Sequence, residues 1–202
     1  MRTKTALTML FLSLAVVAHA GAIYDNLYSA TSDTSPVYNP PYTPPLFDSF
    51  ATSASGLALV DVKLLLSGTP DTASMSVGLY DSNQNLLTPI GSLNDTSLSD
   101  NLAVFDFPLA SPYLLTPNVE YWVALVTYDG SSADWAWSMD QNALGVDGQY
   151  YGYGTGSYQS VFPNTDGPYQ MQVNVDVAPE PSALLLALIG GGILFARRRI
   201  AR

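Results

Sequence analysis

The chain has 202 residues, of which 48% are hydrophobic and 12% charged, a length that fits one domain or two small ones. Its formal net charge is −10, and between residues 21 and 178 a single base, Lys63, stands against sixteen acids, which excludes a basic surface for nucleic acid. The chain has no cysteine and one histidine, His19, in a segment interpreted below as a leader, so thiol nucleophiles, histidine-based serine triads and zinc sites with nitrogen or sulfur ligands are also excluded.

Residues 1–20 have the three regions of a secretory signal peptide. A positively charged start precedes the apolar run at 6–17, which is too short for a comfortable membrane span of about 20 residues. Ala18 and Ala20 are the small residues that a signal peptidase inspects, so we expect cleavage before Gly21. The alternative is an uncleaved N-terminal anchor.

The body of the chain, residues 21–178, alternates between hydrophobic and polar residues over most of its length, which predicts β-strands. Clusters of Gly, Pro, Asn, Asp and Ser separate the alternating runs, as expected for short antiparallel strands. We therefore predict an all-β secreted domain, an antiparallel β-sandwich of about seven to ten strands with jelly-roll-like topology. The clearest predicted strands are 57–66, 75–80, 104–107, 121–128, 135–139 and 170–177.

Two segments of the body depart from this alternation. Residues 35–45 contain five prolines, and because proline cannot donate to a central ladder, we predict an extended surface loop there. Residues 149–158 hold four tyrosines and three glycines, which predicts an irregular edge or a mobile loop. Both segments are of the kind in which function gathers on loops.

Several strand-like segments of the body carry a family resemblance, which spans roughly residues 24–153. They are Phe-Asp-Ser-Phe at 47–50, the long apolar run at 60–66, Val-Gly-Leu-Tyr-Asp at 77–81, the segment 118–125 and Trp-Ala-Trp at 135–137. Together they resemble the choice-of-anchor R type of bacterial secreted domain, a β-sandwich family found with several different C-terminal anchors. The resemblance implies a fold and brings no established catalytic residue, and the proline-rich stretch does not map onto it.

The C-terminal segment, residues 179–202, consists of a Pro-Glu-Pro motif, an uncharged apolar run at 183–196 and a cluster of arginines. The two prolines separate the apolar run from the body. As a helix, 14 residues extend about 21 Å, which crosses a bilayer core of about 30 Å only if flanking residues enter the interface and the arginines snorkel. We predict a single transmembrane helix with cytoplasmic arginines and the body outside.

This order of motif, helix and terminal arginines resembles the PEP-CTERM sorting signal of Gram-negative bacterial surface proteins. The resemblance implies processing by a membrane-embedded exosortase, after removal of the signal peptide, and association with exopolysaccharide or biofilm matrix. Such a signal directs where the protein is sorted and implies no activity. The residues assigned to the sorting motif are Pro179, Glu180, Pro181, Arg197, Arg198 and Arg199.

The segment that starts at Asp81 begins like a calcium-binding loop. Asp81, Asn83 and Asn85 place oxygen ligands at every second position, as such a loop requires. The pattern then fails, because Leu86 occupies the glycine position and Ser92 the position of the bidentate glutamate. These residues are candidate metal ligands, and an ordinary turn between strands is the alternative.

Three other patterns are candidates for a catalytic or sugar-binding site. The Asp-Thr-Ser triplets at 33–35 and 95–97 lack the glycine of paired aspartic-protease motifs, so we interpret them as turns. A carboxylate pair for glycoside hydrolysis can be drawn from the sixteen acids of the body in many ways. The strand residues Trp122, Trp135 and Trp137 fit core packing, with a sugar-stacking platform as the alternative.

These observations predict an exported, surface-sorted protein without enzymatic activity. Its expected partners are signal peptidase, exosortase, the membrane and exopolysaccharide, and its expected location is the inner membrane before processing and the cell surface or extracellular matrix afterwards. No cofactor is expected, with calcium as the one candidate ion. Two alternatives stay open: a carbohydrate-active enzyme that uses a carboxylate pair, and a cation-dependent carbohydrate-binding adhesin.

Overall fold

The computed structural model describes residues 21–38, 45–53, 56–128, 131–146, 151–154, 161–163 and 167–177. These residues form twelve strands and one short 3-10 turn, η1. In chain order the elements are β1 (Gly21–Asp25), β2 (Thr31–Tyr38), β3 (Leu46–Ala51), β4 (Leu57–Gly68), β5 (Ser74–Tyr80), β6 (Leu86–Asn94), η1 (Asp95–Ser97), β7 (Ala103–Leu115), β8 (Glu120–Tyr128), β9 (Ser132–Ser138), β10 (Tyr151–Gly154), β11 (Val161–Pro163) and β12 (Met171–Val177).

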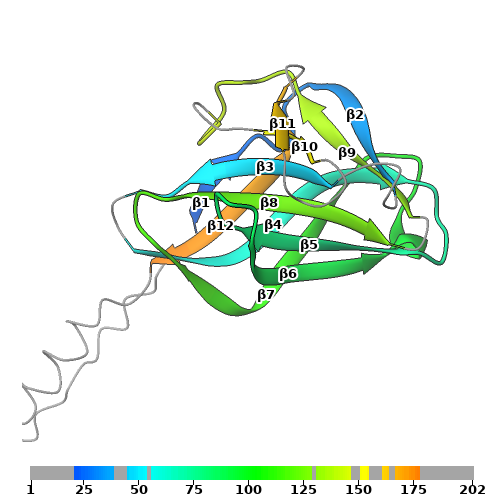
Figure 1. Cartoon of the computed structure of the whole chain (residues 1–202). Helices are drawn as coiled ribbons and strands as arrows, with labels where there is room; N and C mark the ends of the chain where they lie inside the picture. Colours follow the sequence, from blue (N-terminus) through cyan, green and yellow to red (C-terminus); the bar gives the residue numbers. More distant parts are fainter. Residues whose placement is uncertain are drawn as a thin grey trace, which may run out of the picture.

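The strands form two six-stranded sheets that face each other (Figure 1). One sheet has the order β1-β12-β4-β9-β2, with β7 paired to the free side of β4, and the other has the order β11-β10-β3-β8-β5-β6. Every strand pairing is antiparallel. The predicted all-β class with antiparallel sheets is confirmed, and the two facing layers agree with a sandwich.

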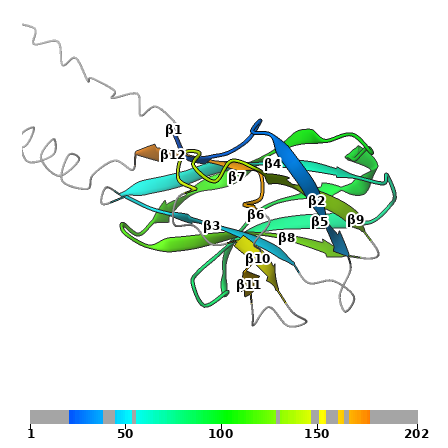
Figure 2. The ribbon, with the colours of Figure 1, turned by 90° about the horizontal axis from the view of Figure 1, so that it is seen from above.

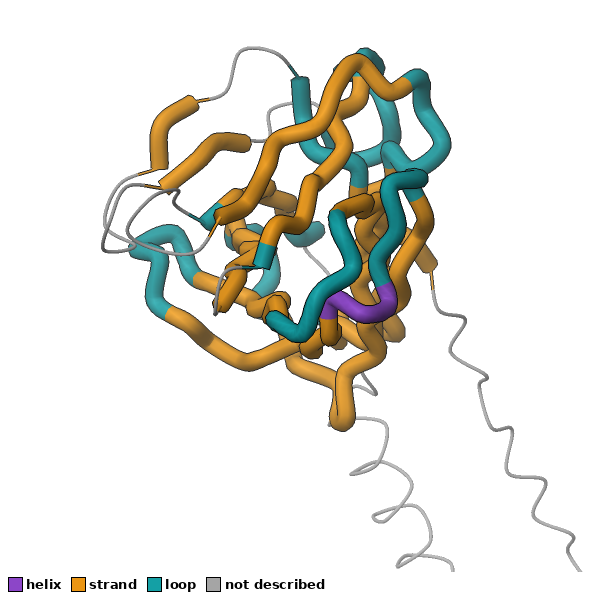
Figure 3. The backbone as a smooth tube through the Cα atoms, turned by 90° about the vertical axis from the view of Figure 1, so that its right-hand side faces the viewer, coloured by secondary structure: helices purple, strands orange, loops and turns teal. Residues whose placement is uncertain are grey.

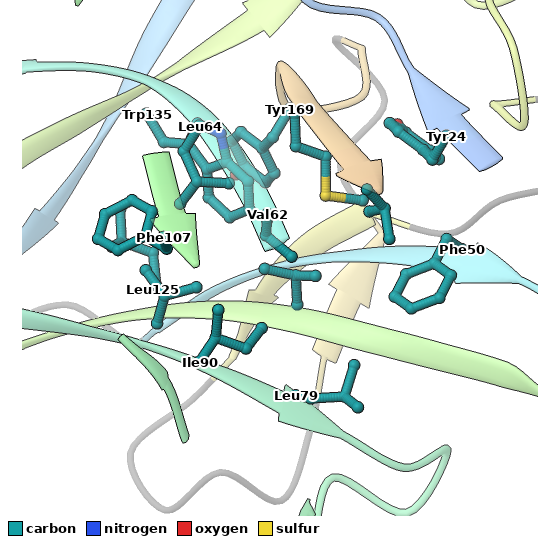
Figure 4. Close-up of a cluster of buried hydrophobic side chains, with 14 of the residues drawn as sticks. Tyr24, Phe50, Val62, Leu64, Leu79, Ile90, Phe107, Leu125, Trp135 and Tyr169 are labelled. Atoms are coloured by element: carbon teal, nitrogen blue, oxygen red, sulfur yellow. The ribbon is translucent and has the colours of Figure 1, made fainter. Parts of the chain in front are cut away.

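The core lies between the two sheets, because alternate residues of each strand point inward. In β8, Tyr121, Val123 and Leu125 join the core cluster, while the residues between them point to the outer face. In β4, the buried set changes register between Leu59 and Val62, where a bulge inserts Val60 as an extra residue opposite β12. Side chains from both sheets meet around Val62 and Leu125 (Figure 4).

Strand β4 organises its sheet. It pairs with β12 along one side, with β7 along the other, and with β9 at its far end, where Leu66 lies opposite Trp135. The matching strand β7 runs from Ala103 to Leu115, far beyond the predicted segment 104–107.

Two sequence predictions need correction. The proposed loop at 35–45 is wrong for residues 35–38, which belong to β2, while 39–44 lie outside the described residues. Among the described strands, β2 ends its sheet and pairs only with β9, so the exposed Pro36 is tolerated there. The proposed irregular edge or loop at 149–158 is wrong for Tyr151–Gly154, because β10 pairs with both β3 and β11.

Both ends of the described domain lie at one pole of the molecule. Gly21 is opposite Val175 across β1 and β12, and Leu57 of β4 is opposite Val177. Strand β4 runs from there to Gly68 at the other pole, which also holds η1, at the right of Figure 1. We call this second pole, with residues 69–73, η1 and Ser131, the distal pole. Figure 2 shows the two layers from above, and Figure 3 looks onto the distal pole.

No helix within the described ranges is long and apolar enough to cross a membrane. The predicted span at 183–196 lies outside those ranges.

Candidate functional site

The predicted calcium ligands Asp81, Asn83 and Asn85 form the turn between β5 and β6. Asp81 Oδ1 accepts hydrogen bonds from the backbone N–H groups of Asn83 at 2.8 Å and Asn85 at 2.9 Å. The side-chain amide of Asn85 donates to Asp81 Oδ2 at 3.0 Å, and this bond is the main cause that lowers the pKa of the exposed Asp81. The carboxylate oxygens are therefore occupied by the turn itself, and an ion there has to displace the Asn85 donor.

The three tryptophans belong to packed clusters. Trp135 is fully buried, stacks on Tyr169 with 4.8 Å between ring centroids, and donates its indole N–H to the carbonyl of Gln170 at 2.9 Å. Trp137 packs edge-on against the same Tyr169 and donates to Ser35 Oγ. Trp122 faces the outer side of its sheet, where it is buried against Phe47. These contacts fit the packing interpretation of all three residues.

The most deeply buried acid, Asp48, lies in the core between Leu46 and Phe50 of β3. Its Oδ2 accepts a hydrogen bond from Tyr24 Oη of the opposite sheet at 2.9 Å. Asn26 extends this network, because its side-chain amide reaches Tyr24 Oη at 3.4 Å and the Tyr169 carbonyl at 2.8 Å. Burial raises the pKa of Asp48 well above its usual value, against the opposing effect of hydrogen bonds from Tyr24 and from the backbone of Ser49 and Tyr169. The network ties the two sheets together.

A second buried acid, Asp95, lies at the distal pole. Asp95 opens η1 directly after β6, and its backbone N–H donates to the carbonyl of Ala73 at 3.0 Å. The backbone N–H of the same Ala73 donates to Asp71 Oδ1 at 2.7 Å, so one residue holds both aspartates. Ser131 lies shortly after the end of β8. At the start of β5, Ser74 lies opposite Asn94 of β6 on one side and Tyr128 of β8 on the other. The segments that hold Asp71, Asp95 and Ser131 therefore lie close together.

The carboxylate of Asp95 and the hydroxyl of Ser131 are both fully buried, and neither has a hydrogen-bond partner among the described residues. Burial raises the pKa of Asp95; the nearby Ser131 hydroxyl opposes this effect, and the negative charge of Asp71 adds to it. The neighbours Asn94, Thr96 and Ser97 are exposed, so the carboxylate lies just beneath the surface. We call Asp71, Asp95 and Ser131 the distal acidic cluster.

Neither buried acid is placed for polysaccharide hydrolysis. A catalytic carboxyl group has to reach the proton or the carbon on which it acts, whereas Asp48 and Asp95 have no exposed surface. Among the described residues, no three acids converge on a metal position. The distal acidic cluster instead combines two carboxylates with a hydroxyl, a set that holds only hard oxygen donors.

Sequence analysis missed this cluster because it interpreted Asp95 as a turn residue and singled out neither Asp71 nor Ser131. The residues Ala18, Ala20, Pro179, Glu180, Pro181, Arg197, Arg198 and Arg199 lie outside the described residues. Gly21 is the exposed first residue of β1.

The chain was compared with protein-family models and with curated proteins. No family model matches it, and no curated protein matches it in sequence.

Proposed function

We propose that this chain is an exported, surface-sorted protein without enzymatic activity, processed by signal peptidase at Gly21 and by exosortase at its C-terminal segment. In this proposal the jelly-roll-like body is held at the inner membrane by the helix at 183–196 before processing. It then associates with exopolysaccharide or biofilm matrix. The resemblance of residues 179–202 to the PEP-CTERM signal is the basis of the sorting step in this proposal.

The observation that carries the proposal is the position of the two domain ends. Strand β1, which contains Gly21, and strand β12, which contains Val177, are the described strands next to the predicted cleavage position and to the Pro-Glu-Pro motif. These strands are antiparallel neighbours, so both ends lie at one pole. A domain of this layout can sit on a C-terminal anchor with its distal pole turned away from the membrane.

Mass spectrometry of the exported protein tests the sorting step. We expect an N-terminus at Gly21 in all strains and loss of the arginine-terminated tail only where exosortase is present. Combined Pro179→Ala and Pro181→Ala should retain the tail, while Pro117→Ala, in an exposed turn of the domain, should be processed normally. An intact Met1, or equal processing of the motif variant, would contradict the proposal.

The absence of catalysis is tested separately, with the purified body and common polysaccharides. We expect no release of reducing sugar and expect co-sedimentation with exopolysaccharide. Release of sugar that a single aspartate-to-asparagine change abolishes would favour a carbohydrate-active enzyme instead.

A further inference from the structure

The distal acidic cluster joins three connections of the fold that are far apart in sequence. Asp71 belongs to the segment between β4 and β5, Asp95 follows β6, and Ser131 lies between β8 and β9. Ala73 fixes the two aspartates relative to each other, since its N–H binds the side chain of Asp71 and its carbonyl binds the backbone of Asp95. Backbone pairing thus places the two aspartates, and Asp71 and Ser131 both lie close enough to Asp95 to influence its pKa.

The cluster contains buried oxygen atoms that the protein leaves unbonded. Asp95 Oδ1, Asp95 Oδ2 and Ser131 Oγ lack a hydrogen-bond partner among the described residues, although both residues are fully buried. Such groups are rare in folded proteins, because each one loses its bonds to water without replacement. The Ser131 hydroxyl shows that charge alone does not explain the cluster, since this group is neutral and its oxygen still lacks a partner among the described residues.

Among the described residues, no base is available to neutralise this cluster. Lys63 is the only base between residues 21 and 178. It lies in the middle of β4, opposite Gln172 on one side and Asp106 on the other, away from the distal pole. The charge of Asp95 and Asp71 is therefore compensated either by a proton or by a cation from solution.

A cation fits the geometry better than a proton does. A proton shared between Asp95 and the neighbouring Asp71 carboxylate removes one charge, but it serves at most one oxygen of Asp95 and leaves the other Asp95 oxygen and the Ser131 hydroxyl without a partner among the described residues. Oxygens that surround a calcium ion at about 2.3–2.6 Å converge on the ion without bonding one another. One ion can coordinate all three unbonded oxygens, whereas one proton serves at most one of them.

We propose that the distal acidic cluster binds a divalent cation of the calcium type through the carboxylates of Asp71 and Asp95 and the hydroxyl of Ser131. Calcium takes roughly six to eight oxygen ligands in irregular geometry, so water and backbone carbonyls have to complete the shell. The ion clamps three connections at the pole opposite the chain ends. This inference does not rest on export or sorting.

Calorimetry tests the proposal with the purified full-length chain, held in mild detergent, stripped with chelator and titrated with calcium chloride. We expect one saturable site in the parent protein and a loss of affinity of about tenfold or more in Asp95→Asn and in Ser131→Ala. Asp81→Asn removes the same charge from the β5–β6 turn and should keep the parent affinity. Ser131→Ala serves as the second variant if Asp95→Asn does not fold.

Thermal melts at matched ionic strength give a second readout. In chelator, Asp95→Asn should melt above the parent protein, because the variant lacks the uncompensated buried charge. In calcium the order should reverse, since only the parent gains a ligand that binds the folded state. Three results would overturn the proposal: no calcium binding by the parent, parent affinity in both Asp95→Asn and Ser131→Ala, or loss of binding in Asp81→Asn.

Discussion

At the scale of single residues, Asp48 is the least expected feature of the molecule. It occupies a core position of β3 between Leu46 and Phe50, where alternation alone predicts a hydrophobic side chain. An ionised carboxylate in such surroundings is destabilising by several kcal/mol unless it is well paired. Here Tyr24 supplies one hydrogen bond, while Asp48 Oδ1 has no partner among the described residues.

The raised pKa of Asp48 predicts how stability depends on pH. The folded state holds this proton more tightly than the unfolded state, so stability is fully present below the ordinary value of 3.8 and falls as pH rises through the raised pKa of the folded protein. Asp48→Asn should flatten this fall and should be more stable than the parent at the alkaline end. Urea unfolding between about pH 4 and pH 8 measures both effects.

The exposed Asp100 provides the control for this experiment. Asp100→Asn makes the same change of charge without altering the core, so its stability should follow the pH dependence of the parent. The buried Asp95 and the partly buried Asp134 have raised pKa values as well, so Asp48→Asn should remove only part of the dependence. An unchanged pH slope in Asp48→Asn would show that Asp48 does not carry this effect.

Trp135 offers a test of packing at the same scale. Trp135→Phe loses the indole bond to the Gln170 carbonyl and leaves a void beside Tyr169. We expect a loss of about 2–3 kcal/mol in the free energy of unfolding. Trp137→Phe, at a half-buried position, should lose less. Equal losses in the two variants would contradict the assignment of Trp135 to the core.

At the scale of elements, prolines explain where sequence reasoning ended strands too early. The predicted segment 104–107 stops just before Pro108, yet β7 continues to Leu115. Pro108 lies at the register shift between β7 and β4, where the ladder is interrupted, and no other described strand pairs with β7 on its other side. Proline is tolerated at such bulges and edges. Pro36 in β2 is a second case.

Alternation predicted the long inner strands but could not assign them to sheets. The segments at 57–66, 121–128 and 170–177 agree with β4, β8 and β12, because each is strongly patterned. Strands β1 and β6 were not predicted, since β1 is short and β6 contains Pro89 and Gly91. The distal acidic cluster could not be predicted either, because alternation does not show which strands pair. Only the pairing of β5 with β6 and β8 brings Asp95 and Ser131 together.

Gly145 controls how the segment after β9 contacts β1. Its φ of +78° is in the left-handed region, and a Cβ there would lie 2.3 Å from the Ile23 carbonyl oxygen. Gly145→Ala should therefore strain the bridge in which Asp25 N–H donates to the Leu144 carbonyl at 2.8 Å. We expect a loss of about 1–3 kcal/mol in the free energy of unfolding.

Gly56 is the matched control, because a Cβ there meets nothing within 4 Å. Gly56→Ala should change stability by less than about 0.5 kcal/mol, as is usual for surface substitutions. Denaturant titration of both variants decides the question. A neutral Gly145→Ala would mean that this contact does not constrain the edge of the sheet.

At the scale of the whole molecule, the sixteen acids and one base of residues 21–178 set up a self-repelling domain. Part of the repulsion is local. Across β2 and β9, the charge of Asp33 adds to burial in raising the pKa of Asp134. Lys63 provides the opposite case, since it lies directly across from Asp106 on β7. Substitution of Asp33 or of Asp106 removes one negative charge in each case. Asp33, however, lies near another acid, whereas Asp106 lies opposite a base.

This difference predicts the response to salt. Sodium chloride should raise the melting temperature gradually as the Debye length shortens from about 30 Å at 0.01 M to about 8 Å at 0.15 M. Asp33→Asn should melt higher than the parent at low salt and gain less from added salt, because it relieves Asp134. Asp106→Asn should not gain this stability, because it leaves Lys63 without its opposite acid. Melts in chelator across the salt series keep any bound divalent ion out of the comparison. If both variants rise equally, total charge alone governs the stability, and the local pairing of charges across the strands has no measurable part in it.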